Sequence, residues 1–230
     1  MQQCCIILSM KENNTFIFDE QGDAHVSHSI DTPVVEAYLK RSDNEKIHEI
    51  EHYFAEIMKT LGLDLEDDSL KGTPYRVAKM FVNEMFSGLT EKNKPCISIF
   101  ENKYQYNKLL IEKNIQLYSA CEHHFLPIIG KVHVAYVSSG NVIGLSKINR
   151  IVQYYAKRPQ VQERLTLQIY NELRQALNTD DVFVMVDAQH LCVSMRGVED
   201  TTSSTITIEY GGCFSEEDKR KECLTLIQKS

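Results

Sequence analysis

The apolar residues in the second half of this 230-residue chain change their spacing from two to four and back to two, and this change constrains the fold most strongly. Between residues 128 and 137, large apolar residues alternate with smaller or polar ones, which predicts a half-buried strand. From residue 161 to residue 177 an apolar residue recurs at every fourth position, which predicts the buried face of a long helix. Residues 182–186 form an apolar run that predicts a buried strand.

Shorter patterns add the remaining strands and one further helix. Residues 115–120 predict a strand before the alternating one. Ser146 can cap a helix whose apolar face extends over residues 148–155. Residues 191–198 and 204–210 predict the two final strands.

The first half of the chain predicts a pair of helices. Residues 47–61 carry apolar side chains at helical spacing. After a loop rich in Asp, Thr73 as N-cap and Pro74 at the first helical position predict the start of the second helix. Gly88 is the predicted C-terminal cap of this helix. We expect the two helices to pack as an antiparallel pair.

The first 40 residues show no sustained periodicity and stay unassigned. The chain therefore divides into a leader (1–40), an N-terminal helical part (41–110) and a sheet-containing domain (111–230).

The composition is that of a folded protein, because 43% of the residues are apolar and 25% are charged. The net charge of −7 excludes a protein that coats nucleic acid through overall positive charge, but it allows a local basic pocket. No stretch approaches the roughly 18 apolar residues that a membrane span needs. The short apolar run Cys4–Leu8 follows no basic segment and precedes no small-residue cleavage site, so we expect a soluble, cytoplasmic protein.

The chain contains seven cysteines, and an odd, widely scattered set of this kind is no disulfide framework. We expect free thiols in a reducing compartment. A cysteine with histidines close to it in sequence is then a candidate for metal binding or catalysis.

Two clusters meet this condition. Cys121 and His124 are three residues apart and can bind one zinc ion from a tight loop. His190 and Cys192 are two residues apart on a predicted strand, so their side chains would lie on one face. With Cys192 as a third ligand, the site would keep an open fourth position, and His123 and His190 would be free for proton transfer. The alternative is that the cysteines are buried only as small hydrophobic residues.

Five basic residues and one serine could together bind phosphate. Three candidates lie at the start of the helix after residue 144, where free N–H groups also favour anions. One lies on the strand predicted for Cys192, and two lie on the second N-terminal helix. The candidates are Ser146, Lys147, Arg150, Arg196, Arg76 and Lys79. The alternative is ordinary solvated surface. The chain carries neither a phosphate-binding loop motif nor a dinucleotide-binding fingerprint.

Gln162 and Glu163 open the long helix. A carboxylate can accept two parallel hydrogen bonds from the N1–H and amino edge of guanine. Glutamate in the first turn of a helix is also common for purely structural reasons, so this pair alone decides nothing.

Taken together, these segments closely resemble type I GTP cyclohydrolases over about residues 45–215. The resemblance is specific because five separate motifs occur in the same order, and the helix Thr73–Met80 also looks like the N-terminal helix of that family. The motifs are Cys121–His124 (CEHH), Gly144–Lys147 (GLSK), Gln160–Thr166 (QVQERLT), His190–Cys192 (HLC) and Met195–Val198 (MRGV).

The resemblance implies a tunnelling fold of the α+β class. Each subunit would add a four-stranded antiparallel sheet and two helices to a pentameric barrel, and two pentamers would stack into a homodecamer. It implies that the catalytic domain, residues 111–230, converts GTP and water to 7,8-dihydroneopterin triphosphate and formate. This hydrolase reaction is the first step of pterin and tetrahydrofolate biosynthesis.

The resemblance also implies roles for the candidate residues. Cys121, His124 and Cys192 would bind Zn²⁺, and His123 and His190 would transfer protons. Glu163, together with Gln162, would bind the guanine base. The triphosphate would be bound by Ser146, Lys147, Arg150 and Arg196, with help from Arg76 and Lys79. The expected partners are GTP and further copies of the chain, with no nucleic acid and no membrane.

The assembly has a physical reason as well. Residues 204–210 alternate in a way that would leave apolar side chains exposed if the strand lay at the edge of the sheet. Unpaired edges of this length are liabilities, and closing a barrel across subunits removes them. We therefore expect active sites at subunit interfaces.

Two other functions stay open from the residues alone. A zinc-stabilised binding module without catalysis, such as a nucleotide sensor or a nucleic-acid binder, should have a coordinatively closed metal site. A related tunnelling-fold enzyme that acts on a pterin or a deazapurine would lack the triphosphate-binding residues.

Overall fold

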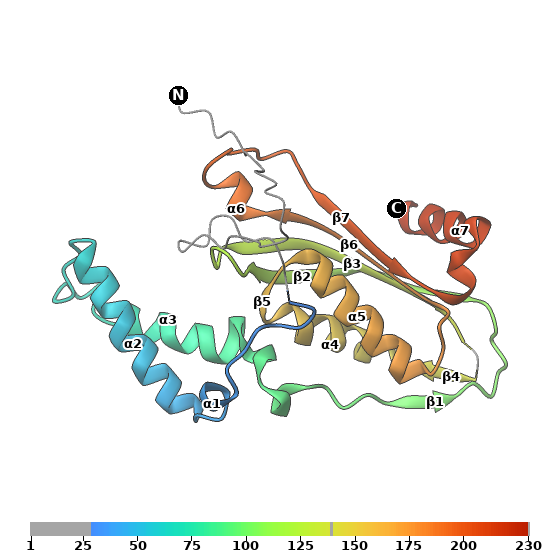
Figure 1. Cartoon of the computed structure of the whole chain (residues 1–230), viewed down its shortest axis with the longest axis horizontal. Coiled ribbons are helices and arrows are strands. Elements are labelled where there is room, and N and C mark those ends of the chain that lie inside the picture. Colours follow the sequence, from blue (N-terminus) through green and yellow to red (C-terminus); the bar gives the residue numbers. More distant parts are fainter. Residues whose placement is uncertain (1–28, 139, 230) are drawn as a thin grey trace, which may run out of the picture. The chain divides into compact units, whose positions relative to one another are not determined.

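The computed structural model describes residues 29–138 and 140–229, so residues 1–28 of the predicted leader lie outside the described part. A five-stranded sheet in the order β5-β2-β3-β6-β7 organises the chain (Figure 1). Its four longer strands pair in antiparallel fashion, and the two-residue β5 pairs in parallel with the end of β2. The strands are β2 (Leu109–Cys121), β3 (Pro127–Val137), β5 (Pro159–Gln160), β6 (Val182–His190) and β7 (Thr205–Tyr210).

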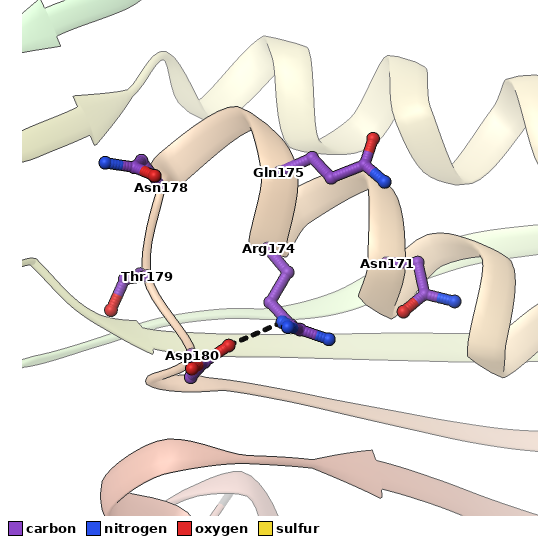
Figure 2. A pocket seen from close by; sticks show the side chains of 6 residues that line it. All are labelled: Asn171, Arg174, Gln175, Asn178, Thr179 and Asp180. Carbon is purple, nitrogen blue, oxygen red and sulfur yellow. Dashed lines mark ion pairs between the residues drawn. The ribbon is translucent and has the colours of Figure 1, made fainter.

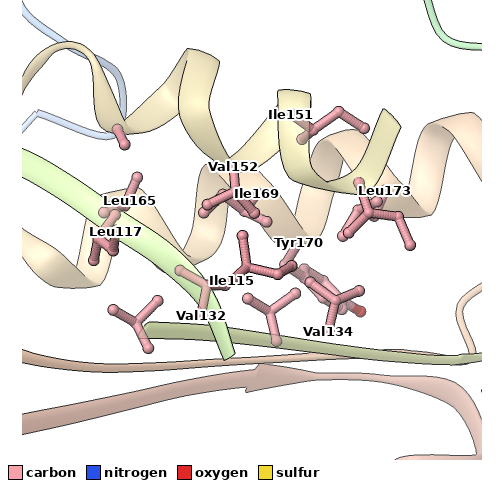
Figure 3. Close-up of a cluster of buried hydrophobic side chains, with 14 of the residues drawn as sticks. Ile115, Leu117, Val132, Val134, Ile151, Val152, Leu165, Ile169, Tyr170 and Leu173 are labelled. Carbon is pink, nitrogen blue, oxygen red and sulfur yellow. The ribbon is translucent and has the colours of Figure 1, made fainter. Parts of the chain in front are cut away.

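Two helices, α4 (Leu145–Ala156) and α5 (Gln162–Leu177), cover one face of this sheet (Figure 1). The main core lies between them and the strands (Figure 3). The residues predicted at every fourth position of the long helix, Leu165, Ile169, Leu173 and Leu177, are each at most 1% exposed. The α+β class and the four-stranded antiparallel sheet with two helices are thereby confirmed.

The opposite face of the sheet is covered as well, by an element that the sequence did not predict. Helix α7 (Glu217–Gln228) and the 3-10 turn η4 (Gly212–Ser215) bury Phe183 and Met185 on that side. The alternation predicted for residues 128–137 is therefore incomplete, because positions 132–136 are all buried. His133, which the pattern placed on a polar face, is 6% exposed.

The predicted N-terminal helices are present as α2 (Asp43–Thr60) and α3 (Thr73–Met80), preceded by α1 (Glu36–Leu39). Ser42 and Glu45 form a reciprocal capping box at the start of α2. The predicted N-cap of α3 is wrong by one residue: Gly72 caps it. The chain already turns before Thr73, whose N–H donates to the carbonyl of Leu70 at 2.9 Å.

Gly88 is not a helix cap. Beyond α3 the chain continues as a π-helical turn η1 (Phe81–Met85) and the 3-10 turns η2 (Ser87–Leu89) and η3 (Glu91–Asn93). The N–H of Gly88 donates to the carbonyl of Lys157 at 2.9 Å. A Cβ at this position would lie 2.0 Å from the carbonyl oxygen of Tyr154, so only glycine allows this close approach to the end of α4.

Residues 191–198 do not form the predicted strand. Strand β6 ends at His190, and Leu191–Ser194 form the short helix α6. The reason is the extent of the neighbouring strands. His190 pairs with Ile128, next to the first residue of β3, and β7 begins opposite Ala188, so residues after His190 have no strand beside them.

The helix predicted after residue 144 begins at Leu145 with Gly144, rather than Ser146, as its N-cap. The N–H of Lys147 donates to the carbonyl of Gly144 at 2.7 Å and already closes the first turn. Strands β1 (Ile99–Glu101) and β4 (Asn141–Ile143) form a separate two-stranded ribbon just before this helix. In the described part of the chain, no helix combines the length and the apolar character that a membrane span requires.

Candidate functional site

Three side chains with metal-binding atoms meet where β2 ends and α6 begins. Cys121 is the last residue of β2, His124 lies in the turn that follows, and Cys192 lies in α6. Their sulfur and nitrogen atoms all lie within 4.8 Å of one another. The turn is held by the N–H of Cys121, which donates to the carbonyl of Leu126, and by that of Phe125, which donates to the carbonyl of Cys121, both at 2.8 Å.

The donor set suits a zinc ion. Two thiols and one imidazole are the ligand types that zinc prefers, and three protein ligands are typical of catalytic zinc. Burial, together with the neighbouring Cys121 thiol, raises the pKa of the Cys192 thiol. A metal ion would reverse this effect, because a coordinated thiol is deprotonated. The strand prediction for Cys192 was wrong, but the structure still brings the three predicted ligands together.

The other two candidate histidines are close to this cluster in the chain. The Nδ1 atom of His123 lies 3.6 Å from the sulfur of Cys121, and its side chain is exposed. His190 ends β6, two residues before Cys192, and is half-buried. Burial lowers the pKa of His190, and the nearby Glu163 carboxylate opposes this effect. The neutral imidazole of His190 is therefore favoured.

Gln162 and Glu163 differ in exposure although they are neighbours at the start of α5. Glu163 is exposed. Gln162 is 1% exposed, and its amide contacts the sheet and the Nε2 atom of His190. Only Glu163 presents its polar group to solvent.

Arg196 is the basic candidate that reaches the metal-binding cluster. It lies in the bend after α6 and donates to Nε2 of His124 at 2.5 Å. In the described residues, no hydrogen bond or ion pair links the other basic candidates to this cluster within one chain.

Ser146, Lys147 and Arg150 lie in the first two turns of α4. Ser146 and Arg150 are exposed and Lys147 is half-buried. Arg150 lines a cavity of about 370 Å³ together with Lys157 and polar residues that follow α3. The other lining residues are Asn83, Ser87, Gly88, Asn93, Pro95, Gln153 and Tyr154.

Arg76 and Lys79 are exposed on α3. The guanidinium of Arg76 donates to the hydroxyl of Thr73 at 2.9 Å and to the carbonyl of Ser69 at 3.3 Å. Arg76 is therefore partly positioned by its own helix.

One pair at the site was missed by sequence reasoning. Arg164, 4% exposed, donates two hydrogen bonds to the carboxylate of Glu122, at 2.6 and 3.2 Å. The same carboxylate lies 3.8 Å from Nε2 of His123. The sequence did contain a signal for this pair. Glu122 lies in the same motif as His123, and Arg164 lies in the same motif as Glu163.

A second polar cavity lies at the C-terminal end of α5 (Figure 2). Its lining residues are Asn171, Arg174, Gln175, Asn178, Thr179 and Asp180. Arg174 is neutralised there by Asp180, with 2.6 Å between nitrogen and oxygen. None of the predicted site residues lines this cavity.

The sequences of known proteins are similar to this chain over most of its length. The family model described as GTP cyclohydrolase I matches residues 50–228. GTP cyclohydrolase 1 from Flavobacterium johnsoniae is 56% identical over 216 residues, which cover 94% of this chain and 97% of that protein. The protein of the same name from Aeromonas hydrophila is 48% identical over 88% of this chain and 93% of its own length. The one from Haemophilus influenzae is 48% identical over 90% and 94%, respectively.

Proposed function

The chain belongs to the GTP cyclohydrolase I family, and from this premise we propose that it converts GTP and water to 7,8-dihydroneopterin triphosphate and formate. The reaction would be the first step of pterin and tetrahydrofolate biosynthesis, in the cytoplasm. The observation that carries the proposal is the meeting of Cys121, His124 and Cys192, with His123 3.6 Å from the sulfur of Cys121 and His190 two residues before Cys192.

We assign the metal site to Cys121, His124 and Cys192, with Zn²⁺ as the ion. A bound zinc ion would supply Lewis acidity at the side of the site that the three ligands leave open. The observation that supports zinc is the donor set itself, two thiols and one imidazole within 4.8 Å of one another.

His123 and His190 would transfer protons to and from the purine. A proton delivered to N7 makes C8 more electrophilic, and later steps require protons at other atoms. Because burial favours the neutral form of His190, this side chain can first accept a proton and then return it. The exposed His123 lies next to Glu122, which can stabilise its charged form.

Glu163 would select guanine. Its carboxylate is exposed in the first turn of α5 and can accept hydrogen bonds from N1–H and the amino group of the base. Adenine lacks both donors on that edge, so the same carboxylate would face the N1 acceptor and the C2–H group.

The triphosphate would be bound by Ser146, Lys147, Arg150 and Arg196, with help from Arg76 and Lys79. The first two turns of α4 place a hydroxyl and two cations together, and the cavity beside Arg150 adds Lys157. Arg196 reaches the metal-binding cluster through His124. In the described residues, no hydrogen bond or ion pair joins the groups on α3 and α4 to that cluster within one chain, so we propose that a neighbouring subunit completes the site.

The edge of the sheet supports such an assembly. In the described residues, β7 pairs only with β6. Its side chains Ile206, Ile208 and Tyr210 are 54%, 37% and 41% exposed. Pairing this edge with another subunit would prevent uncontrolled pairing with other chains and would build the proposed homodecamer of two pentamers.

The test is to incubate the zinc-loaded protein with GTP and to measure formate release and the absorbance of a pterin product. Both products should appear with GTP, and neither should appear with ATP. A binding module without catalysis would bind GTP and release no formate. An enzyme for a free pterin or a deazapurine would leave GTP unchanged, and either result would reject the proposal.

A further inference from the structure

Gln162 connects α5 to the sheet and to His190. Its side chain is buried at the first position of α5 and has polar partners at both ends. Its amide nitrogen faces three acceptors: the carbonyl of Val186 at 3.2 Å, the carbonyl of Thr205 at 2.8 Å and the hydroxyl of Thr207 at 3.1 Å. Its amide oxygen lies 2.8 Å from Nε2 of His190.

The chemistry of the partners decides which way the amide points. If the amide were flipped, its oxygen would face the carbonyl oxygens of Val186 and Thr205, which have no proton to donate. The orientation with nitrogen toward the sheet is therefore the favourable one.

A neighbouring hydroxyl pair agrees with this orientation. The hydroxyl of Thr166 donates to the carbonyl of Gln162 at 2.8 Å, so the hydroxyl of Thr207, 2.6 Å away, has to donate to Thr166. The oxygen of Thr207 is then free to accept from the amide nitrogen of Gln162.

This arrangement determines the proton position on His190. The amide oxygen of Gln162 can only accept, so Nε2 of His190 has to carry a hydrogen. In the described part of the chain, Nδ1 of His190 has no hydrogen-bond partner. The atom at which His190 can accept or donate a proton to a substrate is then Nδ1.

We propose that Gln162 is a positioning residue that holds His190 as the Nε2–H tautomer and leaves Nδ1 to exchange protons with the substrate. This role rests on the proposed function for its meaning in catalysis, although the tautomer itself does not. It differs from the base contact that the family resemblance implies for Gln162, because both ends of the buried amide are bound by protein groups.

The experiment compares the zinc-loaded wild-type protein with the Gln162→Met variant. Methionine has a similar length, but its thioether sulfur is only a weak hydrogen-bond acceptor. Gln160→Met is the matched control, because Gln160 is also fully buried but donates to the carbonyl of Tyr155 and to Gln168 instead of contacting His190. Zinc content per chain is measured for each protein.

Two readouts separate a positioning role from a structural one. Nuclear magnetic resonance of ¹³C,¹⁵N-histidine-labelled protein, with the His190 signals identified by their loss in His190→Ala, should show the Nε2–H tautomer in the wild type. Gln162→Met should lose this preference. Its kcat for GTP should fall by about 10- to 100-fold with an unchanged KM, the loss typical of mutations at residues that orient metal-binding histidines. Gln160→Met should keep the tautomer of His190.

Either of two results would overturn the proposal. One is the Nδ1–H tautomer in the wild type. The other is a raised KM at unchanged kcat in Gln162→Met, which would indicate a base contact. If Gln162→Met does not fold, the resonance measurement on the wild type still tests the proposal, because the proposal requires the Nε2–H tautomer there. If the wild type releases no formate from GTP, the proposed function fails, while the resonance measurement still decides the tautomer.

Discussion

The side chains of the candidate site have two proposed roles: some would bind the metal and others would transfer protons. Cys121→Ser, His124→Ser and Cys192→Ser should each lose both zinc and activity, because each removes one of three ligands. His123→Ser and His190→Ala should keep about one zinc per chain and lose turnover. Metal analysis and formate release measure the two properties separately. Full zinc occupancy in Cys192→Ser would disprove the assignment of that ligand.

Substrate selection is also a property of single residues. Glu163→Ala should remove the preference for GTP over ATP. Lys147→Ala should leave base selection intact and weaken GTP binding by about 10- to 150-fold, since a charge-assisted contact contributes ~1.5–3 kcal/mol. Competition binding with GTP, ATP and guanosine measures both effects. Ring opening of ATP by the unmodified protein would show that Glu163 does not have this role.

At the scale of elements, the contact between η2 and α4 depends on one glycine. Gly88→Ala places a Cβ 2.0 Å from the carbonyl of Tyr154, and both atoms belong to rigid backbone. We expect a loss of about 1–3 kcal/mol, visible as a lowered Tm in calorimetry. Gly144→Ala is the comparison variant: its Cβ would meet only ordinary contacts, the nearest at 3.6 Å, so it should lose only the small difference between glycine and alanine as N-cap of α4. An unchanged Tm for Gly88→Ala would contradict the close packing described here.

The packing of α7 on the sheet makes a prediction about pH. His133 lies on the same face as Ala135 and opposite Met185, in the layer that α7 covers. Burial lowers the pKa of His133, the Lys131 and Lys113 charges act in the same direction, and Asp187 opposes them. The N–H of Asn114 also donates to Nδ1 of His133 at 3.4 Å, which requires that nitrogen to be unprotonated.

Because the pKa in the folded state is lowered, the unfolded chain binds a proton first as the pH falls below about 6.5. Stability that is present above this pH is then lost toward the lower, folded pKa. Between about pH 7 and pH 5, the Tm of His133→Gln should therefore fall by less than the Tm of the wild type. The exposed His48 supplies the control variant, His48→Gln, which should follow the wild type. Parallel Tm curves for His133→Gln and the wild type would disprove the effect.

At the scale of the whole molecule, the proposal of a shared site predicts that residues of two chains act together. If His123 and Arg76 come from different subunits, two inactive variants altered at these positions should regain activity after they are dissociated, mixed and reassembled. Light scattering should show a particle of about ten chains. A monomer at micromolar concentration would reject the assembly, whereas a confirmed decamer without complementation would reject only the shared site.

The sequence alone predicted most of the secondary structure and the side chains that meet at the candidate metal site. The every-fourth-residue pattern of α5 and the apolar run of β6 are local patterns, because burial on one face repeats with the geometry of the element itself. The proximity of Cys121 and His124 is also determined locally, because residues three positions apart in one turn cannot lie far from each other.

The tertiary structure decided what depends on a partner element. Residues 191–194 became a helix because neither β3 nor β7 extends beside them. His133 pairs with Met185, whose side chain packs with residues of α7, and α7 has a weak apolar pattern of its own, with Cys223 and Ile227 as its buried residues. The contacts of Gln162 join residues 24 to 45 positions apart in the chain. No spacing in the sequence encodes such contacts, because they arise only when α5 packs on the sheet.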